Sequence, residues 1–311
     1  MAAEYVPFAG WSKNLRLSND SIELIITLEV GPRIISFRSL KGKNVFKVVE
    51  DQTGQSNEPD WKIRGGHRLW TAPEDFDKTA EGRSLTYVLD NSEVAHRIES
   101  EYRVSVSHEM KRPEKIHREM IITIGDSGPK VEVEHHITNR GQSALEFAPW
   151  ALSVMAEDGY ALIPRPGIGV HPRDFLPNQR VVLWPFTDLS DERLRFGRRI
   201  TKLSQSARSA LKFGLCHEEK WVAYVRGNDL FLKTIPLVEG ASYPDMGSNF
   251  ETFTNHQILE LESLGPLKRV APNETVRHVE TWAVFSGVVL PDIQDEEDLL
   301  KALDPYVLKL L

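Results

Sequence analysis

YPDMGSNFETFTNHQILELESLGPLKRVAPNETVRHVETWAVF, which spans residues 243–285, is the stretch that decides the fold. Three runs rich in apolar, aromatic and β-branched residues are separated here by turn-forming Gly, Pro and Asn. The runs cover residues 249–253, 257–263 and 275–285. This spacing predicts three short β-strands.

The middle run places two carboxylates on one strand face. Strand side chains alternate, so Leu259 and Leu261 share one face while Glu260 and Glu262 share the other, about 7 Å apart. One interpretation is a solvated strand face. The other is a concave site where neighbouring carboxylates shift each other's pKa and become acid–base groups. Nearby polar residues favour the site; they are Asp245, Glu251, Asn255 and His256.

Similar strand-like runs continue through the rest of the chain. They cover residues 21–29, 33–38, 85–89, 94–98, 102–107, 116–124, 130–138, 145–155, 160–163, 181–184, 212–216, 221–226 and 230–236. Helical spacing is convincing only over residues 295–303, where acidic residues at the start suit the helix dipole. The pattern predicts an all-β, mostly antiparallel sandwich with a short C-terminal helix. No repeat or composition shift divides the chain, so we expect one domain over residues 1–311.

Composition excludes several classes of protein. The 311 residues carry a net charge of −7 with a pI near 5.9, which argues against nucleic acid as a partner. Cys216 is the only cysteine, so neither a disulfide nor a cysteine metal cage can form within the chain. The N-terminal residues lack a signal-peptide pattern, and no apolar run reaches the roughly 18 residues of a membrane span. We therefore expect a cytoplasmic protein without a membrane partner; no sequence feature selects an oligomeric state.

RGGHRLWTAPE, residues 64–74, is the second unusual stretch. Paired glycines permit a sharp turn or a close backbone approach, and His67, Arg68 and Trp70 suit a polar ligand with an apolar face. The alternative is a β-bulge that exposes a basic pair. Trp150, in a strongly apolar run, either packs in the core or stacks against a sugar ring.

The remaining histidines and the known catalytic motifs point to no cofactor. His135 and His136 alternate sides of a strand and are interpreted as structural, whereas His217, His256 and His278 are expected at the surface or in turns. The chain contains no HExxH, GxSxG or phosphate-binding GxxxxGK[ST] motif. We expect neither a metal site nor a bound cofactor.

An ordered set of short motifs carries a family resemblance across nearly the whole chain. The motifs are GPRIISFR (31–38), GGHRLWTAPE (65–74), HHITNRG (135–141), APWALSVM (148–155), YPDMGSNFETFTNHQILELESLGPL (243–267) and APNETVRHVETW (271–282). Together they resemble the galactose mutarotase-like, or aldose 1-epimerase-like, superfamily, and more closely an uncharacterised bacterial branch of it. The resemblance implies a β-supersandwich that binds a small-molecule carbohydrate.

The resemblance also implies catalytic roles. Mutarotases use a late-strand carboxylate as base and a histidine as acid to open and reclose a pyranose at its anomeric carbon. Glu262 matches the base best, with Glu260 as second choice. His96 matches the acid by position alone, and His67 competes with it.

Substrate contacts follow from the same resemblance. Arg68 matches an arginine that contacts sugar hydroxyls, and a pyranose is expected to stack on Trp70 or Trp150. Trp150 occupies the place of a second family histidine, and it cannot transfer a proton; His171, in the loop that follows, could supply the missing imidazole. The full set of expected substrate-binding residues is Arg68, Trp70, Trp150, His171, Asp245, Glu251 and Glu260.

Three functional hypotheses remain. The first is a mutarotase-like enzyme acting at the anomeric centre of a sugar or sugar derivative. The second is a carbohydrate-binding or sensing protein without catalysis. The third is an enzyme related to glycoside hydrolases or lyases.

Overall fold

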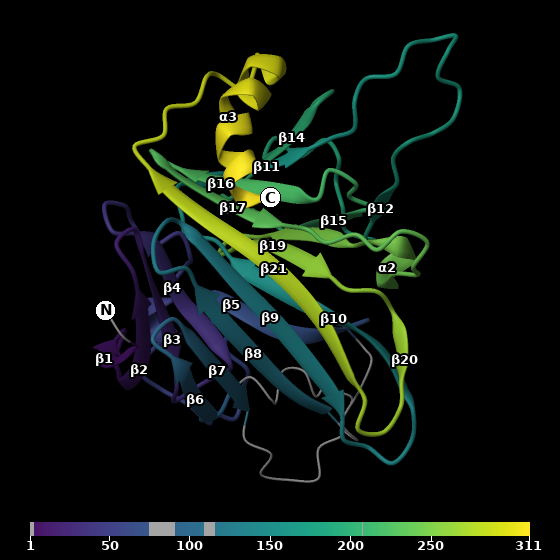
Figure 1. Cartoon of the computed structure of the whole chain (residues 1–311). Helices are drawn as coiled ribbons and strands as arrows, with labels where there is room; N and C mark the ends of the chain where they lie inside the picture. The colour runs from purple at the N-terminus through teal and green to yellow at the C-terminus, as the bar shows by residue number, and fades with distance from the viewer. Residues whose placement is uncertain (1–2, 75–90, 109–115, 207) are drawn as a thin grey trace.

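Two antiparallel β-sheets face each other in the computed structural model (Figure 1). The structure describes residues 3–74, 91–108, 116–206 and 208–311. The strand expected over residues 85–89 lies outside these residues. The prediction of an all-β, mostly antiparallel sandwich is confirmed.

The first sheet contains the strands that the quoted stretch contributes before residue 271. In spatial order its strands are β1 (Glu4–Phe8), β2 (Trp11–Ser18), β3 (Ile22–Thr27), β4 (Arg33–Ser39), β5 (Gly66–Ala72), β10 (Leu145–Val154), β19 (Leu259–Leu264), β18 (Phe250–Thr254), β15 (Leu211–Leu215) and β12 (Val181–Leu183), with β20 (Lys268–Val270) paired to β10.

The second sheet is centred on the long strand β21. Its spatial order is β13 (Leu194–Phe196), β14 (Ile200–Ser204), β11 (Gly159–Pro164), β16 (Trp221–Arg226), β17 (Asp229–Thr234), β21 (Thr275–Ser286), β9 (Lys130–Asn139), β8 (Ile116–Ile124), β7 (Arg103–His108) and β6 (Val94–Ser100).

Side-chain alternation builds the main core between the two sheets. Leu259 and Leu261 of β19 point inward and join a large buried apolar cluster with Phe213, Phe250 and Trp282. Alternate residues of the same first-sheet strands then point to the opposite, outer face. The outer face of β5, β10, β19, β18 and β15 is where the candidate site lies.

The RGGH stretch does not form an exposed bulge. Arg64, His67 and Arg68 are all buried, and β5 begins at Gly66. Gly65 and Gly66 have positive φ, and a Cβ on Gly65 would collide with the carbonyl oxygen of Lys47. The glycines therefore serve a close backbone approach that starts a central strand.

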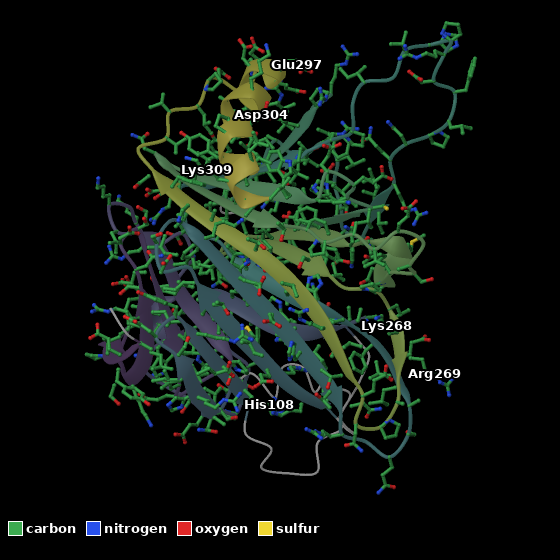
Figure 2. All side chains as sticks on the ribbon, viewed as in Figure 1. His108, Lys268, Arg269, Glu297, Asp304 and Lys309 are labelled. Atoms are coloured by element: carbon green, nitrogen blue, oxygen red, sulfur yellow. The ribbon has the colours of Figure 1, made fainter. Side chains whose placement is uncertain are left out.

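The C-terminal helix is longer than the sequence pattern indicates. α3 runs from Glu296 to Leu310, with the side chain of Asp295 accepting a hydrogen bond from the Asp298 N–H. It continues through Pro305 because Leu299, Leu303, Val307 and Leu310 remain buried along one face. Glu297, Asp304 and Lys309 lie on the outer side of the helix (Figure 2).

Loops and two short helical segments complete the chain. η1 (Glu50–Gln52) and α2 (Pro244–Gly247) are one-turn elements. Residues 165–180 contain neither strand nor helix, and this loop projects from the sandwich (Figure 1). Among the described residues, none of the helices combines the length and apolar character needed to cross a bilayer.

Candidate functional site

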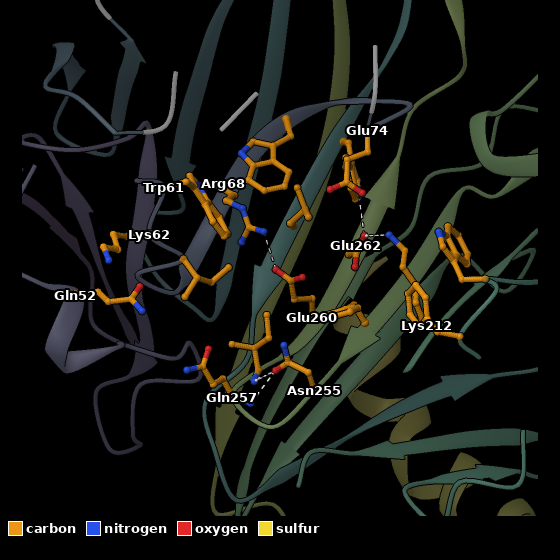
Figure 3. Close-up of a pocket in the computed structure, with 18 residues that line it drawn as sticks. Gln52, Trp61, Lys62, Arg68, Glu74, Lys212, Asn255, Gln257, Glu260 and Glu262 are labelled. Carbon is orange, nitrogen blue, oxygen red and sulfur yellow. Dashed lines mark hydrogen bonds and ion pairs between the residues drawn. The ribbon is translucent and has the colours of Figure 1, made fainter. Parts of the chain in front are cut away.

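A pocket of about 480 Å³ opens on the outer face of the first sheet (Figure 3). Its floor comes from neighbouring strands, and its walls come from the loop before β5, the β18–β19 turn and the segment after β12. It is lined by Gln52, Trp61, Lys62, Ile63, Arg68, Trp70, Glu74, Trp150, Leu152, Trp184, Phe186, Lys212, Phe253, Asn255, Gln257, Ile258, Glu260 and Glu262. The mixture of aromatic walls with a few polar groups is typical of small-molecule sites.

Strand register explains why distant residues meet here. β10 pairs with β5 on one side and with β19 on the other, so that Leu152 lies opposite both Arg68 and Glu262. Trp150 lies opposite Trp70 in the same way. Arg68, Trp70, Trp150, Glu260 and Glu262 thus come together on one face.

Arg68 forms the centre of the pocket floor. Its Nη2 atom donates to Oε1 of Glu260 at 2.8 Å, and its guanidinium lies 4.2 Å from the centre of the Trp70 ring. Trp70 in turn contacts Trp61 and Trp150, with ring centres 5.5 and 5.6 Å apart. The cation–π contact and the ion pair hold Arg68 in one orientation.

Glu262 lies at the other end of the floor, held by two donors. Its Oε2 atom accepts from Nε1 of Trp150 at 2.8 Å and from Nζ of Lys212 at 3.3 Å. Lys212 also pairs with Glu251 at 2.7 Å, and Glu251 lies directly opposite Glu262 in the β18–β19 register. One ammonium group therefore serves two buried carboxylates.

The presence of two buried carboxylates beside one ammonium group determines the pKa shifts at this end of the pocket. Burial raises the pKa of Glu262, and the charge of Glu260 raises it further, against the opposing effects of Lys212 and Trp150. Burial also raises the pKa of Glu251 well above its usual value, with Glu262 and Asp245 contributing. Burial alone would lower the pKa of Lys212, but Glu262 and Glu251 raise it above its ordinary value, so Lys212 keeps its charge.

Some polar atoms of the floor have no hydrogen-bond partner within the described residues. They are Nε and Nη1 of Arg68 and Oε1 of Glu262. Arg68 is 1% exposed and Glu262 is 0% exposed. A buried polar atom without a partner costs free energy, so these atoms are suited to meet the polar groups of a ligand.

The histidines expected at the site lie elsewhere, which corrects the assignment of an acid to them. His67 directly precedes Arg68 on β5, so its side chain faces the other way, between the sheets, where it is fully buried. His96 lies on β6 in the other sheet, where its ring bonds the Tyr5 hydroxyl at 2.9 Å. Neither can exchange a proton with a molecule in this pocket.

Three further expected residues do not line the pocket. His171 is exposed in the 165–180 loop and contacts Phe175. Asp245 lies in α2, and Glu251 is buried behind Lys212, so both act on the site through charge alone. None of these three residues is placed to contact a substrate in the pocket.

A second polar cluster lies between the sheets, directly beneath the pocket floor. Its members are His67, His135, Ser153, Lys233, Ser263, His278 and Glu280. His67 and His135 share a hydrogen bond of 2.8 Å between their Nε2 atoms, and Lys233 pairs with Glu280 at 2.7 Å. We call this set the inter-sheet cluster. The sequence prediction of a surface or turn position is wrong for His278, which lies within β21 and is 4% exposed. His217 lies in the connection between β15 and β16, as a turn position allows, but it is buried at 3% exposure.

His67, His135 and Glu280 are the described residues whose geometry could hold a metal ion, with ligand atoms within 4.8 Å of one another. In this arrangement each already has a protein partner. The ammonium of Lys233 neutralises Glu280, and Trp282 Nε1 donates to the same carboxylate at 2.7 Å. We therefore interpret the three residues as part of a hydrogen-bonded structural cluster.

Sequence reasoning missed Lys212, Trp61 and Trp184. Lys212 is one lysine in an apolar run, and only the β15–β18–β19 pairing brings it to Glu262. Trp61 comes from a segment without strand or helix signals, whereas Trp184 ends the predicted strand run 181–184, and nothing in that run indicates that it reaches Lys212. Tryptophan in an otherwise polar loop was the available signal for Trp61.

Comparison with known proteins places the fold. No family model and no curated protein matches the sequence. Among solved structures, the Slr1438 protein of Synechocystis sp. PCC 6803 matches with a TM-score of 0.58 at 13% identity, over 91% of this chain and 99% of the other. A protein of Escherichia coli K12 provisionally named an aldose 1-epimerase matches at 0.57 and 12%, over 88% and 99%.

A galactose mutarotase-like protein from Lactobacillus casei matches with a TM-score of 0.54 at 9% identity, over 88% of this chain and 100% of the other. These matches span nearly the full length on both sides, although the identities are too low to carry an activity across. They agree with the fold that the sequence resemblance implies. This chain has the galactose mutarotase-like fold.

Proposed function

We propose that the protein binds a sugar in the outer-face pocket and interconverts its anomers, with the Glu262 carboxylate as the base. Support comes from one observation above all. Glu262 is fully buried at the end of an aromatic pocket, its pKa is raised, and its Oε1 atom has no partner within the described residues. A general base working near neutral pH needs a raised pKa and a free lone pair that faces the substrate.

The reaction requires proton transfer at two oxygens. Glu262 takes the proton of the anomeric hydroxyl, the bond between the anomeric carbon and the ring oxygen breaks, and the ring oxygen receives a proton from the Lys212 ammonium. Reclosing on the other face of the carbonyl reverses these transfers and gives the second anomer. No atom is gained or lost.

Lys212 is the proposed donor to the ring oxygen. Its ammonium lies 3.3 Å from Glu262 and keeps its charge beside two carboxylates. A raised pKa makes it a weak acid, so it first hydrogen-bonds to the ring oxygen and gives up its proton only as negative charge develops there. Ring closure returns that proton to Lys212. Arg68 and the tryptophans then orient the ring.

A second candidate function is sugar binding without catalysis. The observation that favours it is the set of pocket-lining residues, which includes no histidine within the described part of the chain. In that case Glu262 and Arg68 would serve only as hydrogen-bond partners of sugar hydroxyls.

The test compares wild type with Glu262→Gln, which keeps the shape and removes the proton acceptor. Binding of a monosaccharide panel would be measured by calorimetry, and anomer interconversion by NMR saturation transfer. We expect the variant to lose roughly 10²–10⁴-fold in rate with a much smaller change in affinity. Lys301→Gln, on the exposed face of α3, is the matched control.

Two outcomes would redirect the proposal. Wild type that binds sugars but interconverts them no faster than buffer supports binding alone. A Glu262→Gln variant as active as wild type moves the base to another carboxylate, with Glu260 first in line.

A further inference from the structure

We infer that the pocket takes a glycan of at least two sugar rings with a free reducing end, rather than a single monosaccharide. This inference rests on the proposed function, because Glu262 fixes where the anomeric carbon lies. It extends that function to a substrate class.

Two aromatic platforms stand at opposite ends of the pocket. Trp61 is half-buried and lies at one end, beside Gln52 and Lys62, whereas Lys212 and Glu262 lie at the other (Figure 3). Nζ of Lys212 is 4.7 Å from the ring centre of Trp184, which is also half-buried. Trp184 therefore marks the Glu262 end.

A continuous row of contacts connects the platforms. Trp61 meets Trp70 at 5.5 Å, Trp70 meets Trp150 at 5.6 Å, and Lys212 lies 4.7 Å from Trp150. Trp70 and Trp150 are buried to 3% and 4% exposure, so their faces are engaged with one another and with Arg68. Of these four tryptophans, the two at the ends, Trp61 and Trp184, have open area for a sugar.

The distance between the platforms exceeds the reach of one pyranose. Trp61 contacts β5, and Trp184 follows β12, the neighbour of β15. From β5 to β15 the sheet crosses β10, β19 and β18, so the axes of the two strands beside which the platforms lie are about 19 Å apart at the usual spacing. A single ring that engages Glu262 at one end leaves Trp61 uncovered.

Polar groups between the platforms suit a second ring. Arg68 pairs with Glu260 at the middle of the floor, yet its Nη1 atom has no hydrogen-bond partner within the described residues. Amide side chains of Asn255 and Gln257 form the wall nearby (Figure 3). Sugar hydroxyls both donate and accept, so they can satisfy a guanidinium and a carboxylate on the same face.

The reducing ring is therefore assigned to the Glu262 and Trp184 end, and the next ring to the Trp61 end. Stacking on an additional aromatic ring contributes about 0.5–1.5 kcal/mol beyond burial, and about 1.4 kcal/mol corresponds to tenfold in affinity. We expect reducing disaccharides to bind up to about tenfold more tightly than their monosaccharides.

The experiment measures affinities of glucose and galactose, and of maltose, cellobiose and lactose, by calorimetry with wild type and variants. Trp61→Ala is expected to lower the ratio of disaccharide to monosaccharide affinity by about tenfold. Trp61→Phe keeps an aromatic face and should largely retain that ratio. Trp184→Ala should weaken both classes of sugar alike.

Phe175→Ala, an exposed aromatic outside the pocket at 74% exposure, is the matched control and should change neither affinity. Monosaccharides that bind as tightly as every disaccharide would overturn the two-ring assignment and leave the proposed function standing. An unchanged ratio in Trp61→Ala would do the same. Absence of binding by both classes would overturn the proposed function together with the inference.

Discussion

The outer and inner faces of β5, β10 and β19 each carry a polar assembly, and the two assemblies differ in whether their buried polar atoms have hydrogen-bond partners. In the inter-sheet cluster, the His67, Ser153 and Lys233 side chains all find partners. In the pocket, Arg68 and Glu262 keep atoms without partners within the described residues. A buried polar group is stabilising only when it is satisfied, so the inner assembly contributes to stability, whereas the outer one is arranged for a ligand.

Lys233 offers the strongest test of whether the inter-sheet cluster stabilises the protein. Lys233→Met removes the ammonium that pairs with Glu280 at 2.7 Å and leaves a fully buried carboxylate without its cation. Breaking a buried ion pair from one side typically costs about 3–5 kcal/mol. We expect a loss of that size in urea-induced unfolding at neutral pH.

Two companion variants show whether the loss comes from the unpaired charge. Lys301→Met removes an exposed lysine that pairs with Asp298, and it should leave the free energy of unfolding almost unchanged. Lys233→Met combined with Glu280→Gln should recover part of the loss. If Lys233→Met unfolds at the same urea concentration as wild type, the inter-sheet cluster does not stabilise the sandwich.

The pH dependence of stability also distinguishes the inter-sheet cluster from the pocket. Burial lowers the pKa of His135 and of His278 to about 3, and it lowers the pKa of His67 well below its usual value. Unfolded histidine titrates near pH 6.5, at about 1.4 kcal/mol per pH unit for one proton. As pH falls below about 6.5, the unfolded chain binds protons that the folded chain refuses, so the unfolding free energy falls.

Glu251 and Glu262 act with the opposite sign. Their pKa values are raised in the folded state, so their stabilising contribution is present at low pH and is lost as pH rises through those values. The free energy of unfolding in urea, measured between about pH 7.5 and about pH 5, should distinguish the effect of the buried histidines from that of the two glutamates, because the two effects change with pH in opposite directions. His135→Gln is expected to reduce the acid slope by about one histidine, and His171→Gln, which changes an exposed loop residue, should not. Equal slopes in all three proteins would mean that His135 does not remain neutral when folded.

The strand pattern of the sequence predicts most of the fold, and it also explains where the prediction of the site was wrong. Leu259 and Leu261 point inward and Glu260 and Glu262 line the pocket, because side-chain alternation is a local property. The same rule excludes His67 once β5 is known to begin at Gly66, since adjacent strand residues face opposite ways.

Other features depend on pairing between distant strands. Lys212 reaches Glu262 only through the order β15, β18, β19, and nothing within one strand indicates its neighbour. The strands β1, β2, β5, β13, β14 and β20 were not predicted either, because short or polar runs obtain their strand conformation from the ladder that they join. The extent of α3 past Pro305 likewise depends on burial against the second sheet.

The smallest expected effect concerns the hydrogen bond from Trp150 to Glu262. Nε1 donates to Oε2 at 2.8 Å, and this contact lowers the pKa of Glu262 against the larger effect of burial. Trp150→Phe removes the donor and keeps an aromatic ring, so the pKa of Glu262 should rise further. If Glu262 is the base, the acidic limb of the pH–rate profile for anomer interconversion should move to higher pH. Saturation transfer across the pH range gives the profile, with Trp70→Phe as the matched variant that alters the same aromatic row without touching this hydrogen bond. If the profile shifts equally in both variants, the effect comes from the loss of an indole from the row. If the acidic limb stays in place in Trp150→Phe, the titrating base is a carboxylate other than Glu262.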